Sequence, residues 1–262
     1  MTRFRFGVTA AATGDLAAWM ATARRVESAG FATLLLPETT RGPAPLPALA
    51  AAAAATTTLH VGSWVLCEPL HDPARLTWEA RTLHDLAGDR VELGLGAGRP
   101  GAEQDAAALG LPYPGPAARV SRLAGTLRRL RAEVPGLRLL VAASGPWMLR
   151  LAGREADTVA AGWAPDTGLA AARAVLTHVA GDAERAAGLV AVNDSPAPWL
   201  ARAGTSTAAL AAAGAVTVLT GTPRAMADEL LRRRDALGVG YWTVPEPALA
   251  AFAPVVELLA GQ

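Results

Sequence analysis

A glycine-rich run carries the strongest chemical signal in the sequence: Gly94-Leu95-Gly96-Ala97-Gly98-Arg99-Pro100-Gly101. It matches the G-x-G-x-x-G spacing of dinucleotide-binding loops, but it follows the fourth predicted strand, and a short helical stretch and a proline-rich loop come after it. We therefore favour a strand-end turn whose backbone approaches a flat ring or a phosphate closely. The alternative is an ordinary turn that needs glycine for a positive φ.

A second loop, Ala142-Ala143-Ser144-Gly145-Pro146, lies between a predicted strand and a helix that begins at Pro146. The free N–H groups of a helix N-terminus suit a phosphate, although an ordinary helix start explains the same residues. Ser144 is not part of a G-x-S-x-G elbow, so the sequence indicates no hydrolase nucleophile.

Glu38 and His71 are the candidates for acid–base chemistry. Glu38 follows the second predicted strand, and His71 lies in the loop after the third. A barrel enzyme can place a carboxylate at such a strand end, but a simple loop-end charge explains Glu38 equally well. The four histidines show no metal-ligand spacing, and the single cysteine, Cys67, excludes a cysteine-rich site, so we predict no bound metal.

Four tryptophans fall inside or just after predicted strands: Trp64, Trp147, Trp163 and Trp242. Core packing is the default explanation for each of them. Several tryptophans at one barrel mouth would instead form an apolar pocket for a flat ligand.

The elements that would position these residues alternate between short apolar runs and amphipathic helices. The predicted strands are Phe4–Val8, Thr33–Leu36, His60–Cys67, Arg90–Leu95, Leu137–Ala142, Thr158–Gly162, Leu189–Val192, Ala215–Thr220 and Tyr241–Val244. Runs that are apolar on both faces indicate a parallel sheet covered by helices. The count is eight or nine βα units, uncertain between Leu189 and Val218. Eight units predict a closed (β/α)8 barrel, and a doubly wound open sheet is the alternative.

Length and charge agree with one α/β barrel domain over residues 1–262. The chain has 262 residues, of which 52% are hydrophobic and 18% charged, and such a barrel needs about 250. The formal net charge of +1 argues against a nucleic-acid or anionic-membrane protein. No apolar stretch reaches the ~18 residues of a spanning helix, so we expect a cytoplasmic protein.

Further segments carry a family resemblance: Val61–Leu66, Asp72–Ala74, Thr82–Leu86, Gly88–Gly98, Ala118–Leu123 and Ser144–Asp157. With these segments the sequence resembles the luciferase-like flavin and deazaflavin oxidoreductases over nearly its whole length. The C-terminal segments from Gly221-Thr222-Pro223 to Leu259-Ala260-Gly261 resemble the actinobacterial branch that depends on coenzyme F420. The region from Ala164 to Gly214 matches poorly and is shorter than in the family.

The resemblance implies a (β/α)8 TIM barrel, often dimeric, with an isoalloxazine or deazaflavin ring at the carboxyl mouth of the barrel. It also implies a non-proline cis peptide behind the ring, at Trp64–Val65. The family's glycine-rich loop corresponds to Gly96–Gly98 and its phosphate loop to Ala143–Gly145. The predicted cofactor-binding residues are Val8, Trp64, Val65, Gly96, Ala97, Gly98, Arg99, Ala143, Ser144, Gly145, Pro146 and Trp163.

The sequence departs from the family pattern at the expected catalytic positions. Many members carry Asp-His after the second strand, where this chain has Glu38-Thr39. We therefore predict Glu38, Thr39 and His71 as the catalytic residues, with Glu38 as the acid–base group or its organiser. Arg99 stands where an aromatic or acidic residue is usual, and it could hold an anionic tail or substrate.

The predicted function is hydride transfer from reduced coenzyme F420 to an activated C=C, C=N or C=O bond of a small secondary-metabolite-type substrate. The expected assembly is a homodimer, with no nucleic-acid or membrane partner. One alternative is an FMN-dependent luciferase-like monooxygenase. The other is a non-catalytic barrel that acts as a partner subunit or ligand-binding module, which the absent Asp-His pair and the short region after Ala164 motivate.

Overall fold

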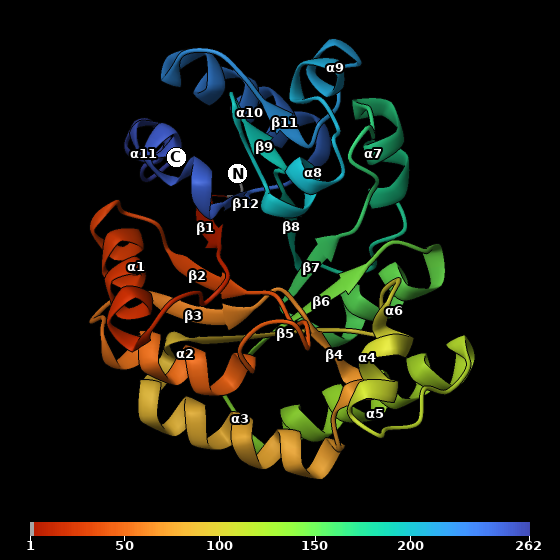
Figure 1. Cartoon of the computed structure of the whole chain (residues 1–262). Coiled ribbons are helices and arrows are strands. Elements are labelled where there is room, and N and C mark those ends of the chain that lie inside the picture. Colours follow the sequence, from red (N-terminus) through yellow and green to blue (C-terminus); the bar gives the residue numbers. More distant parts are fainter. Residues whose placement is uncertain (1–2) are drawn as a thin grey trace.

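The structure, a computed structural model that describes residues 3–262, is built on a closed parallel barrel (Figure 1). Its strands are β1 (Arg5–Thr9), β2 (Thr33–Leu36), β3 (His60–Ser63), β4 (Leu66–Cys67), β5 (Val91–Gly96), β6 (Arg138–Ala143), β7 (Thr158–Ala161), β8 (Glu184–Gly188) and β12 (Tyr241–Pro245). The order is β3-β2-β1-β12-β8-β7-β6-β5-β4, and a further β3–β5 pairing closes the ring. Because β3 and β4 are halves of one interrupted strand, the described residues form an eight-stranded barrel, as predicted, and not an open sheet.

Helices surround the strands (Figure 1). They are α1 (Leu16–Ser28), α2 (Pro45–Ala54), α3 (Pro73–Ala87), α4 (Ala102–Ala108), α5 (Pro116–Glu133), α6 (Pro146–Glu155), α7 (Leu169–Leu176), α8 (Pro198–Arg202), α9 (Thr207–Ala212), α10 (Pro223–Leu237) and α11 (Leu249–Leu258), with 3₁₀ turns η1 (Glu68–Leu70), η2 (Gly88–Arg90) and η3 (Glu246–Ala248). Asp72 begins α3 as predicted, since its Oδ1 accepts from the Arg75 N–H at 2.9 Å. Gly238 ends α10 with φ +68°. Within residues 3–262, no helix combines the length and apolar character needed to cross a bilayer.

The prediction of the seventh barrel strand was wrong. The strand is Glu184–Gly188, whereas Leu189–Val192 contains only the short β9 (Ala191–Val192). Together with β10 (Ser195–Pro196) and β11 (Val218–Leu219), β9 forms a separate three-stranded sheet, so the predicted strand Ala215–Thr220 is not part of the barrel either. The apolar runs of this region pack in a core of their own, while the true strand begins with two charged residues and therefore lacks a strand-like pattern.

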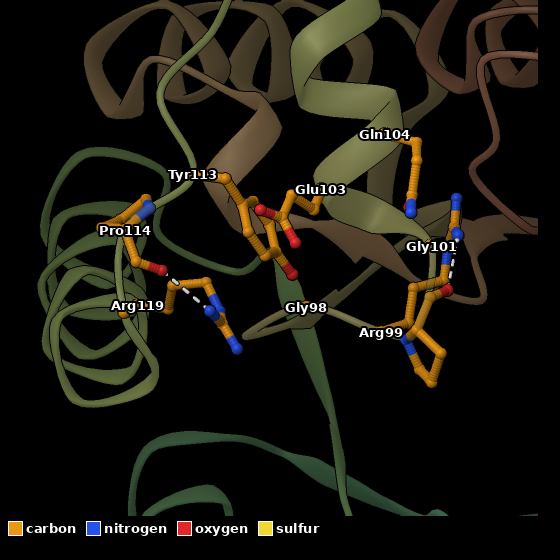
Figure 2. Close-up of a pocket in the computed structure, with 10 residues that line it drawn as sticks. Gly98, Arg99, Gly101, Glu103, Gln104, Tyr113, Pro114 and Arg119 are labelled. Carbon is orange, nitrogen blue, oxygen red and sulfur yellow. Dashed lines mark hydrogen bonds between the residues drawn. The ribbon is translucent and has the colours of Figure 1, made fainter.

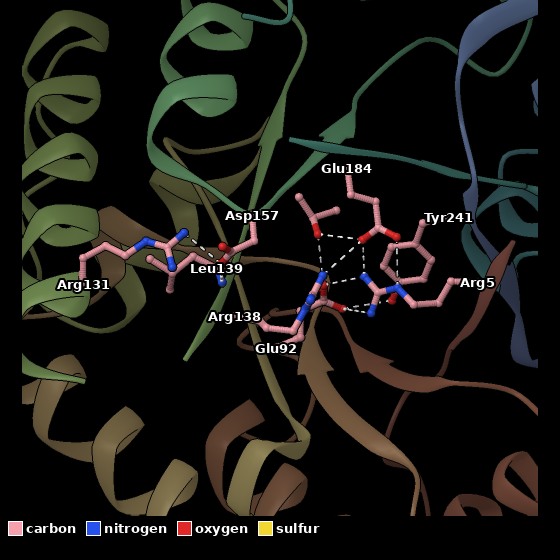
Figure 3. A network of polar contacts seen from close by, with 9 residues as sticks. Arg5, Glu92, Arg131, Arg138, Leu139, Asp157, Glu184 and Tyr241 are labelled. Atoms are coloured by element: carbon pink, nitrogen blue, oxygen red, sulfur yellow. Dashed lines mark hydrogen bonds and ion pairs between the residues drawn. The ribbon is translucent and has the colours of Figure 1, made fainter. Parts of the chain in front are cut away.

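Charged side chains fill the floor of the barrel, at the amino ends of its strands (Figure 3). Arg5 lies 2.8 Å from the fully buried carboxylate of Glu92 and 2.6 Å from Glu184. The Arg5 guanidinium also stacks 3.7 Å above the Tyr241 ring. Burial, followed by the Glu92 carboxylate, raises the pKa of Tyr241 well above its ordinary value, so its hydroxyl stays protonated and donates to Glu92 at 3.1 Å.

Above this floor the barrel interior is apolar. Leu35, Leu140, Ala160, Ala186 and Tyr241 are buried against one another, and Trp64, Val65 and Ala142 pack on them. The side chains become smaller toward the carboxyl ends of β6, β7 and β8, where Ala142, Gly162 and Gly188 lie. This taper leaves space at the mouth of the barrel.

Candidate functional site

A cavity of about 200 Å³ lies at the mouth of the barrel and is called the mouth cavity below. It is lined by Trp64, Val65, Ala142, Ala160, Ala161, Gly162, Trp163, Gly188, Val190 and Thr217. A Cβ built on Gly162 would make only ordinary van der Waals contacts, at 3.6 Å from the Ala143 carbonyl oxygen and from Ser144 Cβ, so an alanine fits at this position. The volume is below the roughly 300–1,000 Å³ of sites that enclose a whole drug-sized ligand, which suits a ring with its tail outside.

The peptide bond between Trp64 and Val65 is cis, which agrees with the family resemblance. It lies at the interruption between β3 and β4, and both residues line the mouth cavity. Trp64 packs edge-on against Tyr241, with ring centroids 6.5 Å apart. The indole of Trp64 therefore joins the apolar interior of the barrel to its mouth.

The glycines of β5 make room for Val65. A Cβ on Gly94 would collide with the Ser63 carbonyl oxygen and come within 2.9 Å of Val65 Cγ1, and a Cβ on Gly96 would lie 3.1 Å from Val65 Cγ2. Gly94 and Gly96 thus allow β5 to pack closely behind the cis peptide segment. Among the residues of the glycine-rich run, none lines the mouth cavity itself.

Trp163 brings a hydrogen-bond donor to the mouth cavity. Its indole Nε1 is buried and has no partner among the described residues. An N–H in that position is costly unless an acceptor meets it. Small side chains, an apolar wall and one free donor together fit a flat aromatic ring that carries carbonyl oxygens.

Glu38 and His71 lie together, as a pair, just beyond the ends of β2 and β4. His71 Nε2 is 2.8 Å from Glu38 Oε1, and the Cys67 N–H donates to Glu38 Oε2 at 2.7 Å. Neither side chain lines the mouth cavity, but Cys67 lies only two residues beyond Val65, which does. The pair therefore lies next to the cavity rather than in its wall.

Thr39 and Arg99 stabilise the loops around this pair. Thr39 Oγ1 accepts from the Arg41 N–H. The Arg99 guanidinium forms an ion pair with Asp105 and donates to the Glu38 carbonyl oxygen at 3.2 Å. Thr40 also donates to Asp105, so Arg99 joins the loop after β5 to the loop after β2.

A second and larger cavity, of about 570 Å³, lies beside Gly98 and is called the charged cavity below (Figure 2). Arg99, Glu103 and Gln104 line it from the turn after β5 and from α4, while Tyr113 and Arg119 line it from the following loop and the start of α5. Its volume falls within the usual range for small-molecule sites.

The other predicted cofactor residues line neither cavity. Val8 is fully buried in the core between the barrel and its helices. Ala143, Ser144, Gly145 and Pro146 form the turn from β6 into α6, where Ser144 is exposed and no side chain caps the helix. The phosphate-loop role of this turn stays a prediction.

The residues that sequence reasoning missed are small strand-end residues or lie in and around the loop between α4 and α5. Ala142, Ala160 and Gly188 contribute to the mouth cavity by lacking bulk, a property that sequence hides among ordinary strand residues. Glu103, Tyr113 and Arg119 meet only through the folding of a proline-rich loop. The one sequence signal for this cavity was Gly98 in the glycine-rich run. Its φ of +118° lies at the turn beside which Glu103, Tyr113 and Arg119 line the cavity.

Comparison with known proteins adds a family and a fold. The profile of the luciferase-like monooxygenase family matches residues 1–236. An F420-dependent glucose-6-phosphate dehydrogenase of Beutenbergia cavernae is 34% identical over 140 residues, a match that covers 44% of this chain and 41% of that relative. The chain thus matches less than half of the relative's length.

Solved structures with the same fold include enzymes of two cofactor types. An F420-dependent secondary alcohol dehydrogenase in complex with an F420–acetone adduct superposes with a TM-score of 0.77, at 14% identity and over 98% of each chain. The coenzyme F420-dependent tetrahydromethanopterin reductase of Methanopyrus kandleri gives 0.70, at 17% identity and over 97% of each chain. The oxygenating constituent of 3,6-diketocamphane monooxygenase from Pseudomonas putida, in complex with FMN, gives 0.72, at 14% identity and over 100% of this chain and 99% of the other.

Proposed function

Because the chain belongs to the luciferase-like monooxygenase family, we propose that it is an oxidoreductase that uses coenzyme F420 to reduce or oxidise a small molecule. The observation that carries the proposal is the mouth cavity, with its apolar wall, its small strand-end residues and the unpaired Trp163 N–H. The F420-dependent relative from Beutenbergia cavernae supports the choice of cofactor.

The residues that would hold the deazaflavin ring are Trp64, Val65 and Trp163. When bound, the deazaflavin exchanges a hydride with the substrate at one ring carbon. Val65 and the indole of Trp64 would exclude water from one end of the cavity, and the indole N–H of Trp163 would be available to an oxygen of the ring. Gly162 and Gly188 leave the ring its space.

Glu38 and His71 form the proposed proton-holding pair. Reduction of a C=C, C=N or C=O bond needs one proton for each hydride. His71 Nε2 lies 2.8 Å from the Glu38 carboxylate, so the pair can hold that proton between its two side chains. The pair delivers or removes the proton at the rim of the mouth cavity.

The second candidate is an FMN-dependent monooxygenase. The observation in its favour is the close fold match to an FMN-bound oxygenating enzyme, with a TM-score of 0.72. The Asp-His that many members carry is replaced by Glu38-Thr39 in this chain, a difference that applies to both candidates.

Titration of the purified chain with reduced F420 and with FMN distinguishes the candidates. We expect saturable quenching of F420 fluorescence and no saturable change with FMN. Saturable FMN binding together with oxygen consumption in the presence of a reductant would replace the proposal by the monooxygenase. Binding of neither cofactor would overturn both and favour a non-catalytic barrel.

The proposed assembly is a cytoplasmic homodimer that acts on a small-molecule substrate, as the family resemblance implies. Light scattering on the eluting peak of a sizing column tests the oligomeric state. A mass near 54 kDa, twice the 26.8 kDa of one chain, is expected, and a mass near 26.8 kDa would contradict the dimer.

A further inference from the structure

The charged cavity holds two opposite charges that do not neutralise each other. Arg119 and Glu103 both line it, yet neither takes part in an ion pair within residues 3–262. The remaining pair of charges at this turn, Arg99 and Asp105, is already joined. One free cation and one free anion therefore face the same space of about 570 Å³.

Arg119 is held in a fixed orientation. Its Nε donates to the Ala97 carbonyl oxygen and its Nη1 to the Pro114 carbonyl oxygen, both at 2.8 Å. Its guanidinium carbon lies 4.5 Å from the centroid of the Tyr113 ring. No acceptor among the described residues takes the N–H groups of Nη2, so that edge of the guanidinium is available to a ligand (Figure 2).

Glu103 lies at the start of α4 and lines the same cavity as Tyr113 and Arg119 (Figure 2). Its side chain is exposed and makes no hydrogen bond to another described residue. Partial burial is the largest cause that raises the pKa of Tyr113 above its ordinary value, so its hydroxyl is a neutral donor at physiological pH. The cavity is therefore lined by a cation, a neutral donor and an anion.

Gly98 is the residue that permits this arrangement. Any Cβ at this position would collide with the Tyr113 hydroxyl and come within 3.1 Å of Arg119 Nε. Gly98 also connects the two cavities, because it lies two residues beyond Gly96, which touches Val65 of the mouth cavity. Two extended residues span about 7 Å, so the charged cavity lies near the mouth cavity along β5 and the turn that follows it.

We propose that the charged cavity binds the zwitterionic head group of an amino-acid-like substrate, with its carboxylate at Arg119 and its ammonium at Glu103. That this molecule is the substrate rests on the proposed function, whereas its binding does not require the cofactor. A purely anionic ligand, such as the acidic tail of a cofactor, would meet the uncompensated Glu103 carboxylate. A purely cationic ligand would be repelled by the Arg119 guanidinium.

Three probes with the same propyl side chain test the charges one at a time: L-norvaline, N-acetyl-L-norvaline and L-norvaline amide. Binding to the cofactor-free chain is measured by ligand-detected NMR and calorimetry. We expect L-norvaline to bind most tightly and each derivative to bind about tenfold more weakly, since each loses one charge-assisted contact.

Glu103→Gln separates the zwitterion from a simple anion. Because Glu103 has no protein partner, this variant should fold as the parent chain does. It should weaken L-norvaline about tenfold and strengthen N-acetyl-L-norvaline, while the same change at an exposed glutamate outside both cavities, Glu257→Gln, leaves both within about twofold. Arg119→Gln should weaken both ligands. Unchanged or tighter L-norvaline binding in Glu103→Gln, or no saturable binding of any probe, overturns the proposal. F420 titration of the same samples shows separately whether the proposed function holds.

Discussion

His71 Nε2 lies 2.8 Å from Glu38 Oε1, although 33 residues separate the two in sequence. The other oxygen of the same carboxylate accepts from the Cys67 N–H at 2.7 Å. Glu38 therefore pairs with a titratable ring and also fixes β4 beside the mouth cavity. A glutamine at position 38 keeps an oxygen for Cys67 but removes the charge, so mutation can separate the two roles.

We predict that Glu38→Gln lowers kcat by about 10²–10⁴-fold, the usual worth of general acid–base catalysis, and leaves cofactor affinity nearly unchanged. The reason is that the pair of Glu38 and His71 loses its carboxylate charge, while the Cys67 N–H of β4 keeps an oxygen acceptor at position 38. The measurement is the pH profile of kcat alongside a cofactor titration, and the control is His178→Gln, a histidine that lies beyond α7. A parallel loss of cofactor affinity and activity would show that Glu38 only positions β4.

We predict that Gly98→Ala weakens L-norvaline binding by more than about tenfold, because the added Cβ displaces Tyr113 and Arg119. Gly110→Ala is the matched control, since Gly110 also has a positive φ, of +68°, but nothing within 4 Å of its Cβ position. Gly98→Ala should also lose more thermal stability than Gly110→Ala, because the φ of +118° at Gly98 lies outside the left-handed helical region and its Cβ would collide with Tyr113. Equal ligand affinity in the two variants would contradict the packing role of Gly98.

We predict that Gly162→Leu blocks the mouth cavity. A Cβ at this residue makes only ordinary van der Waals contacts, so the backbone accepts the substitution, but the larger side chain would extend into the mouth cavity. F420 affinity should fall by more than about tenfold, with little change in thermal stability, and Gly162→Ala should have an intermediate effect. Retained affinity in Gly162→Leu would place the ring elsewhere.

The sequence predicts the barrel well wherever a buried strand is apolar on both faces. β2 (Thr33–Leu36) is an example, and its predicted bounds match the structure. The sequence did not predict β8, because the strand begins with two charged residues. Glu184 pairs with Arg5 at the floor of the barrel, and Arg185 donates to the Leu237 carbonyl oxygen at 3.0 Å. Charges that fold inward remove the hydrophobic pattern on which strand prediction depends.

For the site, the sequence predicts single positions better than their partners. Glu38 and His71 stand out as titratable groups near strand ends, yet only the folded barrel brings them within hydrogen-bond distance. From the sequence, Arg99 is a cation that could hold an anionic group, but in the structure it forms an ion pair with Asp105, six residues further on. The turn between the two residues has no periodic pattern from which this pair could be predicted. Loop geometry decides such pairings, and the pattern of residue types does not encode it.

We predict that Glu92→Ala destabilises the fold by roughly 2–4 kcal/mol, because the buried Tyr241 hydroxyl loses its Glu92 acceptor and Arg5 keeps only the Glu184 carboxylate. Glu92 is fully buried and accepts from Arg5, Tyr241 and Thr158 at the barrel floor. Denaturant unfolding measures the loss. Arg75→Gln, which breaks an exposed pair with Glu79, should cost at most about 1 kcal/mol. A loss of similar size in both variants would show that the floor network contributes little to stability.

We predict that Glu27 makes the stability of the fold pH-dependent in the acid range. Its carboxylate accepts from the N–H groups of Thr58, Thr57 and Leu59 at 2.7, 2.8 and 3.0 Å, and these hydrogen bonds, that of Thr58 foremost, lower the pKa of Glu27 to about 2. Since the folded pKa lies below the unfolded value of about 4.3, the contribution is complete above that value and disappears as the pH falls toward 2.

Glu27→Gln tests this pH dependence, because the amide oxygen still accepts hydrogen bonds but carries no charge. Solvent screening limits the loss at neutral pH to about 1 kcal/mol. In denaturant unfolding, the difference in unfolding free energy between the parent chain and the variant should be constant from pH 7 to 5 and shrink between pH 4 and 2. Glu79→Gln controls for the loss of one surface carboxylate that accepts no backbone N–H. A difference that persists unchanged at pH 2 would mean that the hydrogen bonds to Glu27 do not depend on its charge, and that this corner between α1 and β3 is stabilised by packing alone.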